Sequence, residues 1–522
     1  MLTKNKFMLP LVGMLFSTLI SSVSFGDLIT DYESANKPGI LNWLADGRSN
    51  NKPSYYCSHF YLKTLYKSGL SVRDQAQAVQ TWVETCRRHF EQNYRAGDLT
   101  VLFDFTMLQT RITHNKLIRP VEIKTADGRI LNGTLGFIND GKKRPLVIGR
   151  CGVYCSGMSG SAVTSFVGHL FEESHFNVLF LQSMTNKDYS AANKTISVSG
   201  FDEAGQMFEM AQDLDNVAEG LHRSTSEVHF MGYSLGAHAA LFTSLIASLN
   251  TSRVPIRSVV ALCPVVDLQT QMEYLFKEDS IRGKIVAFVN RTLLKTMNRL
   301  FPIFTDEELI NVAHDSEGLK KIISVNNLRF YQRNAANLSF AKYNPYRGVK
   351  IETFDDIWKL SRWQDYASQV RIPTFVAGSR DDSVVSFKLN TGIIPTEGND
   401  SLGVVKFEGG NHCGFDLYGG WGLSSVMLNS FMDSHSDNVY PTLTVPLDNV
   451  KWDDTALSLM KEDSVIQSYD WETVPKDDIA ILNVYVPKDG ASKCSRSWER
   501  PCNTDNMDVY RYNFPLVLMK QA

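Results

Sequence analysis

The stretch VHFMGYSLGAHAAL, residues 228–241, passes from an apolar run to an alanine-rich run through a single Gly-Tyr-Ser-Leu-Gly. The apolar run predicts a buried strand and the alanine-rich run predicts a helix, so the chain must turn sharply at Ser234. Gly232 and Gly236 flank this serine, and residues without a side chain suit a corner where a strand and a helix come close. A serine at such a corner lies at the carboxyl end of its strand, where open α/β sheets bind their ligands.

Short apolar runs elsewhere in the chain alternate with helical stretches and predict a parallel sheet. Strands that are apolar on both faces need helices over both faces, which indicates the α/β class with a mostly parallel central sheet. Residues 121–137 predict a hairpin around an Asp-Gly turn, and residues 201–222 predict one covering helix. The predicted parallel strands are residues 145–149, 177–181, 228–231, 258–262 and 373–378.

Changes in pattern along the chain predict its domain organisation. We expect four segments: a signal peptide at 1–26, a helical N-terminal extension at 27–120, the α/β domain at 121–437 and a β-rich C-terminal extension at 438–522. Residues 268–371 interrupt the strand-helix alternation and form a helical insertion that is too long for an ordinary loop. Its apolar side chains indicate core packing in a helical subdomain, and the alternative is a lid over the site.

The N-terminus has the pattern of a targeting segment. Lys4 and Lys6 precede an apolar run over residues 7–20, and small residues follow up to Gly26. The run is shorter than the roughly 20 residues that span a membrane, so we expect cleavage near Gly26 more than a membrane anchor. The protein is therefore expected to be exported, either secreted or periplasmic.

Charge and cysteine content limit the partners and metals. With 53 Lys and Arg against 56 Asp and Glu, the net charge of −3 provides no basic field for nucleic acid. Export favours disulfide formation among the eight cysteines. Cys151 and Cys155 lack the spacing and the second ligand pair of a zinc site, so we predict no structural metal. The candidate disulfide pairs are Cys57 with Cys86 and Cys494 with Cys502.

A serine nucleophile needs a base, and the base needs an acid that orients it. The strand at 373–378 runs into Asp381 and Asp382, and a later apolar run leads to His412 in a glycine-flanked loop. Parallel strands bring their carboxyl ends to one edge, so these side chains are expected beside Ser234. We predict Asp382 as the acid, with Asp381 as the closest alternative and Asp267 as a second one.

Backbone amides are expected to stabilise the oxyanion. The amide of Leu235 opens the helix after Ser234, and a glycine-rich loop after the strand at 145–149 offers a second amide from Gly152 or Val153. Among the other histidines, His238 is expected to point away from the serine, and His435 is a weaker rival base because it follows a helix.

The segments GYSLGAHAAL, GSRDDSVV and GGNHCGF together resemble those of serine hydrolases of the α/β-hydrolase fold, over residues 121–437. The CPVVDL turn, the helical insertion and the paired aspartates look similar to the YheT-like carboxylesterase branch, although no proline follows the second aspartate here. The resemblance implies cleavage of carboxylic esters through an acyl-serine, with Ser234 as nucleophile, His412 as base and Asp382 as its acid. It implies no metal and no organic cofactor.

This resemblance implies a small-molecule or lipid ester as substrate. It is compatible with peripheral contact with a lipid surface, and it does not specify the oligomeric state. One alternative is a serine peptidase or amidase on the same fold. The pair Glu307-Glu308 suits recognition of a peptide amino terminus, but acidic residues at a helix N-terminus explain the pair more simply. Another alternative is a catalytically inactive hydrolase-like binding module.

Overall fold

The computed structural model divides the chain into two units. The larger, residues 59–415 with 423–440, contains an eight-stranded sheet, and the smaller, which includes residues 441–521, contains a four-stranded sheet. The structure describes residues 66, 69–86, 117–156, 167, 170–171, 176–275, 328–334, 338–409, 412–413, 431–436, 450–451, 468–474, 479–487 and 507–515. Outside the described part lie the signal segment, the Glu307-Glu308 pair and the predicted pairing partners Cys57, Cys494 and Cys502.

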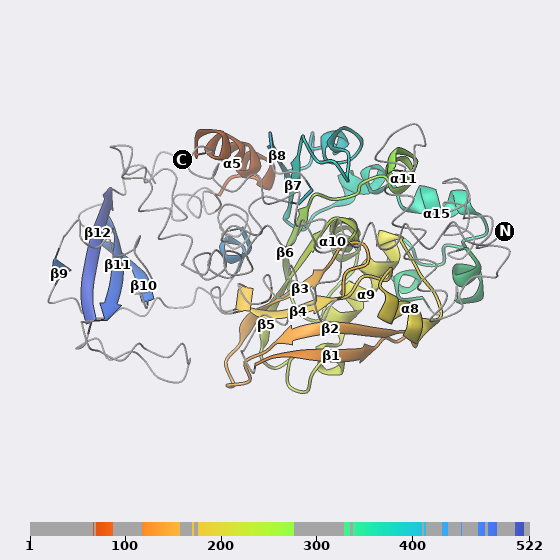
Figure 1. The fold of residues 1–522 in the computed structure, drawn as a ribbon, viewed down its shortest axis with the longest axis horizontal. Coiled ribbons are helices and arrows are strands. Elements are labelled where there is room, and N and C mark those ends of the chain that lie inside the picture. The colour runs from red at the N-terminus through yellow and green to blue at the C-terminus, as the bar shows by residue number, and fades with distance from the viewer. Residues whose placement is uncertain are drawn as a thin grey trace, which may run out of the picture. The chain divides into compact units, whose positions relative to one another are not determined.

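The eight-stranded sheet has the order β1-β2-β4-β3-β5-β6-β7-β8 (Figure 1). Strands β4, β3, β5, β6, β7 and β8 run parallel to one another, and β1 and β2 join antiparallel at one edge. This confirms the predicted α/β class with a mostly parallel sheet. The strands are β1 Ile118–Lys124, β2 Ile130–Gly136, β3 Arg144–Arg150, β4 Asn177–Leu181, β5 Thr225–Tyr233, β6 Ile256–Leu262, β7 Thr374–Ser379 and β8 Leu402–Phe407.

Each strand lies where an apolar run predicts it, and the predicted hairpin turns at Gly128, whose φ is 84°. The helices with described bounds in this unit are α5 Val72–Cys86, α8 Lys187–Asn193, α9 Gly200–Gln212, α10 Leu235–Leu249, α11 Leu268–Leu275 and α15 Phe354–Leu360. Its short 3-10 helices are η5 Leu214–Asn216, η6 Ser339–Lys342, η7 Trp363–Gln369, η8 Phe387–Leu389 and η9 Thr391–Ile393.

Helices α9 and α10 cover one face of the sheet. Met207 of α9 and Ala239 of α10 pack in one buried cluster with strand residues such as Phe230 of β5. The prediction of a single helix over residues 201–222 was too long, because α9 ends at Gln212. Asp213 leaves the helical conformation at φ −136°, ψ 70°, and the chain continues as the 3-10 helix η5.

The opposite face is covered by segments from both ends of the unit. Phe375 of β7 packs against Tyr66 and Phe431. The helix α5 lies beside the edge strand β8, where the Gln80 side-chain amide accepts from the Lys406 N–H (2.6 Å) and donates to the Lys406 carbonyl (2.9 Å). An edge strand exposes unpaired backbone groups, so this contact satisfies part of that edge.

The described part of the 268–371 insertion packs into the core. Trp363 is fully buried and its Nε1 donates to the carbonyl of Leu241 on α10 at 2.8 Å. Aromatic side chains of the insertion surround Phe201 of α9, and they come from Tyr331, Phe340 and Tyr346. These contacts agree with the core-packing interpretation for the described residues.

Helix α9 also buries charge, which its apolar stripe does not reveal. Asp202 of α9 accepts two bonds from the Arg129 guanidinium at 2.8 Å, and Asp127 accepts two more, with Nε at 2.9 Å. The three side chains are at most 6% exposed. Such a group is costly to break, because removal of one partner leaves the others charged and buried.

Replacement of Arg129 by methionine is therefore expected to lower the free energy of unfolding by about 3–5 kcal/mol. Arg73→Met is the matched control, since Arg73 is 39% exposed, its partners Asp74 and Asp400 are 45% and 73% exposed, and such pairs contribute about 1 kcal/mol or less. Urea denaturation of both variants provides the comparison. Equal losses in the two variants would contradict a structural role for the buried group.

The four-stranded sheet of the smaller unit has the order β10-β11-β12-β9. Its strands are β9 Val450–Lys451, β10 Ser468–Val474, β11 Ile479–Pro487 and β12 Met507–Pro515. Strands β11 and β12 lie within residues 438–522, where the sequence predicts a β-rich extension. Among the residues described in either unit, none belongs to a helix with the length and apolar character needed to cross a membrane.

Candidate active site

Ser234 occupies the corner between β5 and α10. Its backbone has φ 57° and ψ −124°, a region that residues with a side chain rarely adopt and that costs of order 1–3 kcal/mol. The Ser234 amide donates to the carbonyl of Leu262, the last residue of β6, at 2.9 Å. The neighbouring strand thus holds the strained turn in place.

The two glycines beside Ser234 are needed for close packing. A Cβ on Gly232 would overlap the carbonyl of Gly236, and a Cβ on Gly236 would overlap the carbonyls of Arg150 and Cys151. All of these obstacles are backbone atoms, so they cannot move aside as a flexible side chain would. The corner therefore excludes larger residues at both positions, as the sequence predicts.

Three side chains from three strand ends meet at this corner. His412 Nε2 lies 2.9 Å from Ser234 Oγ, and His412 Nδ1 lies 2.9 Å from Asp382 Oδ2 and 3.1 Å from Oδ1. In this arrangement the serine hydroxyl donates to Nε2, and the protonated Nδ1 donates to the carboxylate. The geometry can pass the serine proton to the imidazole and stabilise the resulting positive charge.

The loop after β7 holds the Asp382 carboxylate in place. Its Oδ1 accepts from the amides of Val384 and Val385, both at 2.8 Å, and its side chain is 2% exposed. Asp381 is exposed and accepts a bond from Ser379 Oγ at 2.5 Å. The carboxylate that contacts His412 is thus that of Asp382.

Asp267, the second alternative acid, contacts other residues. It accepts from Gln364 at 3.1 Å and from the Thr270 amide at 3.0 Å, and it pairs with Arg362 at 3.5 Å. These bonds attach the start of α11 to the start of η7. They give Asp267 a place in the packing of the insertion.

The loop after β3 lies directly against the serine. A Cβ built on Gly152 would be 3.0 Å from Ser234 Cβ and 3.4 Å from its Oγ, so the backbone at 152 borders the space above the hydroxyl. A disulfide joins Cys151 to Cys155, and the Cys155 amide donates to the Gly152 carbonyl at 3.2 Å. Leu235 is the first residue of α10. Gly152 and Leu235, the predicted oxyanion donors, therefore both adjoin Ser234.

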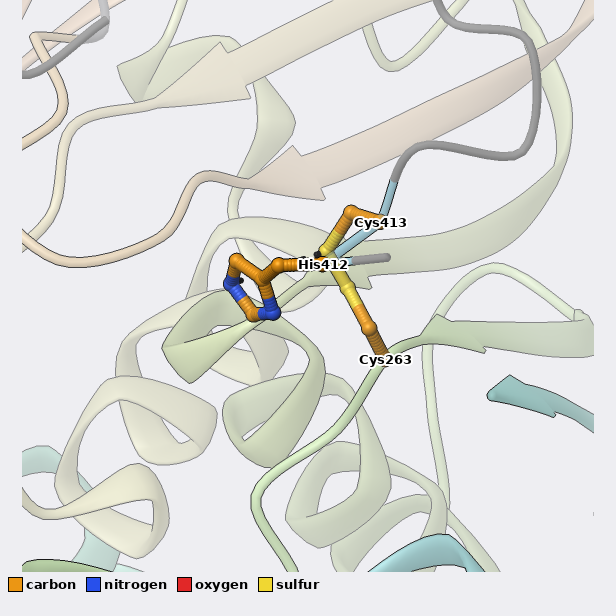
Figure 2. A group of neighbouring side chains, drawn as sticks. All are labelled: Cys263, His412 and Cys413. Carbon is orange, nitrogen blue, oxygen red and sulfur yellow. Dashed lines mark hydrogen bonds between the residues drawn. A yellow bond between two sulfur atoms is a disulfide. The ribbon is translucent and has the colours of Figure 1, made fainter. Parts of the chain in front are cut away.

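A second disulfide, between Cys263 and Cys413, lies beside His412 (Figure 2). The donor atoms of these three residues lie within 4.8 Å of one another, a spacing that could suit a metal ion. A metal would require two thiolates and a free imidazole nitrogen. The sulfurs are bonded to each other and both ring nitrogens have hydrogen-bond partners, so this arrangement does not fit a resident metal.

The other two candidate histidines lie elsewhere. His238 Nδ1 donates to the carbonyl of Val265 at 2.8 Å, and burial lowers the pKa of His238 to about 4. His435 Nδ1 bonds the Phe431 carbonyl at 2.9 Å within its own helical turn, and burial lowers its pKa too. The prediction that His238 points away from the serine holds.

The lowered pKa of His238 predicts loss of stability in acid. An unfolded histidine has its usual pKa near 6.5, so between pH 6.5 and 4 the unfolded chain binds a proton that the folded chain does not. The stabilisation is complete above pH 6.5 and is lost as the pH falls through 4, by about 3 kcal/mol. His238→Asn, whose amide can still donate to Val265, should show a smaller loss between pH 7 and pH 4 in urea denaturation. Equal pH dependence in both proteins would contradict this.

Neither of the two active-site disulfides was among the predicted pairs. Cys263 follows β6 and Cys413 follows His412, so both lie at the carboxyl edge of the sheet. That shared edge was the available signal, because residues after neighbouring parallel strands come together there. Cys151 and Cys155, considered only as metal ligands, pair within one loop.

Comparisons with known proteins give matches only among solved structures. No family model matches the chain, and no curated protein sequence matches it. An esterase from Pyrococcus furiosus aligns at 14% identity over 59% of this chain and 90% of that one, with a TM-score of 0.33. An esterase domain from Rhodothermus marinus aligns at 12% identity over 61% of this chain and 95% of that one, with a TM-score of 0.32.

Longer proteins match in part. The dipeptidyl peptidase 4 of Porphyromonas gingivalis aligns at 13% identity and a TM-score of 0.33, over 56% of this chain but 32% of that one. This chain thus spans about a third of the peptidase. The fold assignment rests on the chain's own topology: the strand order and the β5–Ser234–α10 corner show that this protein has the α/β-hydrolase fold.

Proposed function

We propose that the protein is a serine hydrolase that cleaves carboxylic esters through an acyl-serine intermediate. The observation that carries this proposal is the continuous contact from Ser234 Oγ through the His412 imidazole to Asp382, with both hydrogen bonds at 2.9 Å. A serine placed at a strained corner and hydrogen-bonded to an oriented imidazole is a nucleophile with its base.

In the first half of the reaction, Ser234 Oγ attacks the ester carbonyl while its proton moves to His412 Nε2. Asp382 keeps the imidazole in the tautomer with Nε2 free and stabilises the imidazolium. The negative oxygen of the tetrahedral intermediate points to the amides of Leu235 and of Gly152 or Val153, and one such donor contributes about 3 kcal/mol in the transition state. The imidazolium then protonates the departing alcohol, which leaves an acyl-serine.

In the second half, His412 takes a proton from water, and the hydroxide oxygen attacks the acyl carbonyl. The same amides stabilise the second tetrahedral intermediate. Collapse returns the proton from Nε2 to Ser234 Oγ and releases the carboxylic acid. Three side chains, Ser234, His412 and Asp382, together with the backbone amides thus carry every proton and charge of the cycle.

Esters are the simplest substrates for this site, because an alcohol leaves a tetrahedral intermediate more readily than an amine. We assign the substrate to small-molecule or lipid esters, and contact with a lipid surface would follow for the latter. Export to the periplasm or the exterior belongs to the same proposal. The disulfides Cys151–Cys155 and Cys263–Cys413 support it, because disulfides persist in oxidising compartments.

The test compares nitrophenyl esters of increasing acyl length with nitroanilides that carry the same acyl groups. We expect kcat/KM for each ester to be at least about 100-fold above that for the matched amide. We also expect the KM for the esters to depend on acyl length. Amide or peptide cleavage that equals ester cleavage would instead support a peptidase. Absence of both, in a folded protein that also resists a fluorophosphonate, would support an inactive binding module.

A further inference from the structure

Cys263 lies beside the backbone hydrogen bonds and the disulfide that connect the segments of all three active-site side chains. Its neighbour Leu262 accepts the amide of Ser234, and the Cys263 amide itself donates to the carbonyl of Ala377 on β7 at 2.7 Å. Strand β7 leads to the loop of Asp382. The disulfide from Cys263 then reaches Cys413, the residue directly after His412.

The nucleophile is thus held by a hydrogen bond from β6 and the acid by amides of the loop after β7, whereas the residue after the base is held covalently. His412 contacts Ser234 and Asp382, and the residue directly after it, Cys413, is bonded through the disulfide to Cys263 at the end of β6. Cys413 has φ 53° and Cys263 has φ 45°, so both are in the left-handed region that disfavours residues with a side chain. A conformation of this kind persists only where its surroundings enforce it.

We propose that the Cys263–Cys413 disulfide is the positioning element of His412, so that its reduction switches the site off. The expected effect of reduction on the rate rests on the proposed hydrolase function. The dependence of the His412–Asp382 contact on the disulfide does not rest on that function.

Reduction needs a dithiol reductant, which gives two electrons and two protons. The bond between the two sulfurs breaks, each sulfur gains one hydrogen, and the dithiol closes to its own disulfide. Relief of the backbone strain then favours relaxation of Cys263 and Cys413 away from their left-handed conformations. Cys413 Sγ lies 3.9 Å from His412 Nε2, so its new S–H group would also compete with Ser234 for that nitrogen.

A shift of about 1 Å in a catalytic group can cost about 100-fold in rate, and the cost falls on kcat because the base acts in the transition state. Reduction is therefore expected to lower kcat about 100-fold and to change KM less than about threefold. Reoxidation should restore the rate.

The experiment uses the full chain in two backgrounds. In Cys151→Ala/Cys155→Ala the other active-site bridge is absent and the Cys263–Cys413 bridge remains. In the quadruple variant, which adds Cys263→Ala and Cys413→Ala, both are absent. We expect dithiothreitol to lower kcat about 100-fold in the first variant and to leave the already low kcat of the second unchanged. Equal loss in both would assign the effect to other cysteines and overturn the proposal.

A second readout does not depend on turnover. The proton on His412 Nδ1, bonded to Asp382, should give a low-field NMR signal in the oxidised first variant and lose it on reduction. Alkylation and mass spectrometry confirm free thiols at positions 263 and 413. Persistence of the signal with both thiols free would overturn the proposal, whereas loss of the signal in a protein with no esterase activity would reject the proposed function alone.

Discussion

Replacing Ser234 with alanine is expected to lower kcat/KM for a nitrophenyl ester by about 10⁶-fold, down to the residual rate from binding and the oxyanion amides. The loss is this large because the hydroxyl oxygen forms the bond to the substrate carbonyl, and alanine has no atom that can replace it. The backbone at Ser234 already tolerates a Cβ, so alanine preserves the corner. Steady-state kinetics of the purified variant, with circular dichroism to show that it is folded, measure the effect.

His412→Ala should lose a similar factor, and the double variant Ser234→Ala/His412→Ala should lose no more than either single one. Residues that act in one step are not additive, because the base has no role without the nucleophile. Additive losses would mean that the two side chains work separately. A folded Ser234→Ala protein with normal turnover would end the mechanism.

Asp382→Asn is expected to lower kcat by about 10⁴-fold, whereas Asp381→Asn should change it less than about threefold. An amide at 382 would no longer hold the proton on His412 Nδ1, so the nitrogen that faces Ser234 would lose its lone pair for part of the time. Asp381 is exposed and accepts a bond from Ser379, so its charge has no place in the proton transfer. The two neighbours thus form a matched pair of substitutions.

The measurement is kcat for both variants across pH 5 to 9. A loss in the Asp382→Asn rate that persists across this range would agree with an imidazole held in the wrong tautomer, because the ratio of the two neutral tautomers does not depend on pH. A larger loss for Asp381→Asn than for Asp382→Asn would reverse the assignment of the acid.

The local sequence was sufficient to predict the positions of the strands and the edge of the sheet at which the active-site residues lie. Each apolar run lies in a strand, because a strand that is buried on both faces consists of consecutive apolar residues, and such a run is recognisable in the sequence. Ser234, Asp382 and His412 follow three of these strands, and parallel strands deliver such residues to one edge. The meeting of the three side chains therefore followed from periodicity and order along the chain.

Pairings between distant segments were beyond the sequence. Asp202 of α9 looks like a solvated acidic residue in a first helical turn, yet it is fully buried against Arg129 from the hairpin. Cys263 and Cys413 are 150 residues apart, and nothing local marks one as the partner of the other. The end of α9 at Gln212 was also missed, because apolar spacing continues beyond the point where the backbone leaves the helix.

Covalent labelling tests the central claim most directly. Wild-type protein and the His412→Ala variant would be treated with a fluorophosphonate, and the modified residue located by mass spectrometry. We predict phosphonylation of Ser234 in the wild type, and labelling at least about 10³-fold slower in the variant, because the base raises the nucleophilicity of the hydroxyl. A label on another residue, or equal rates in the two proteins, would contradict the account.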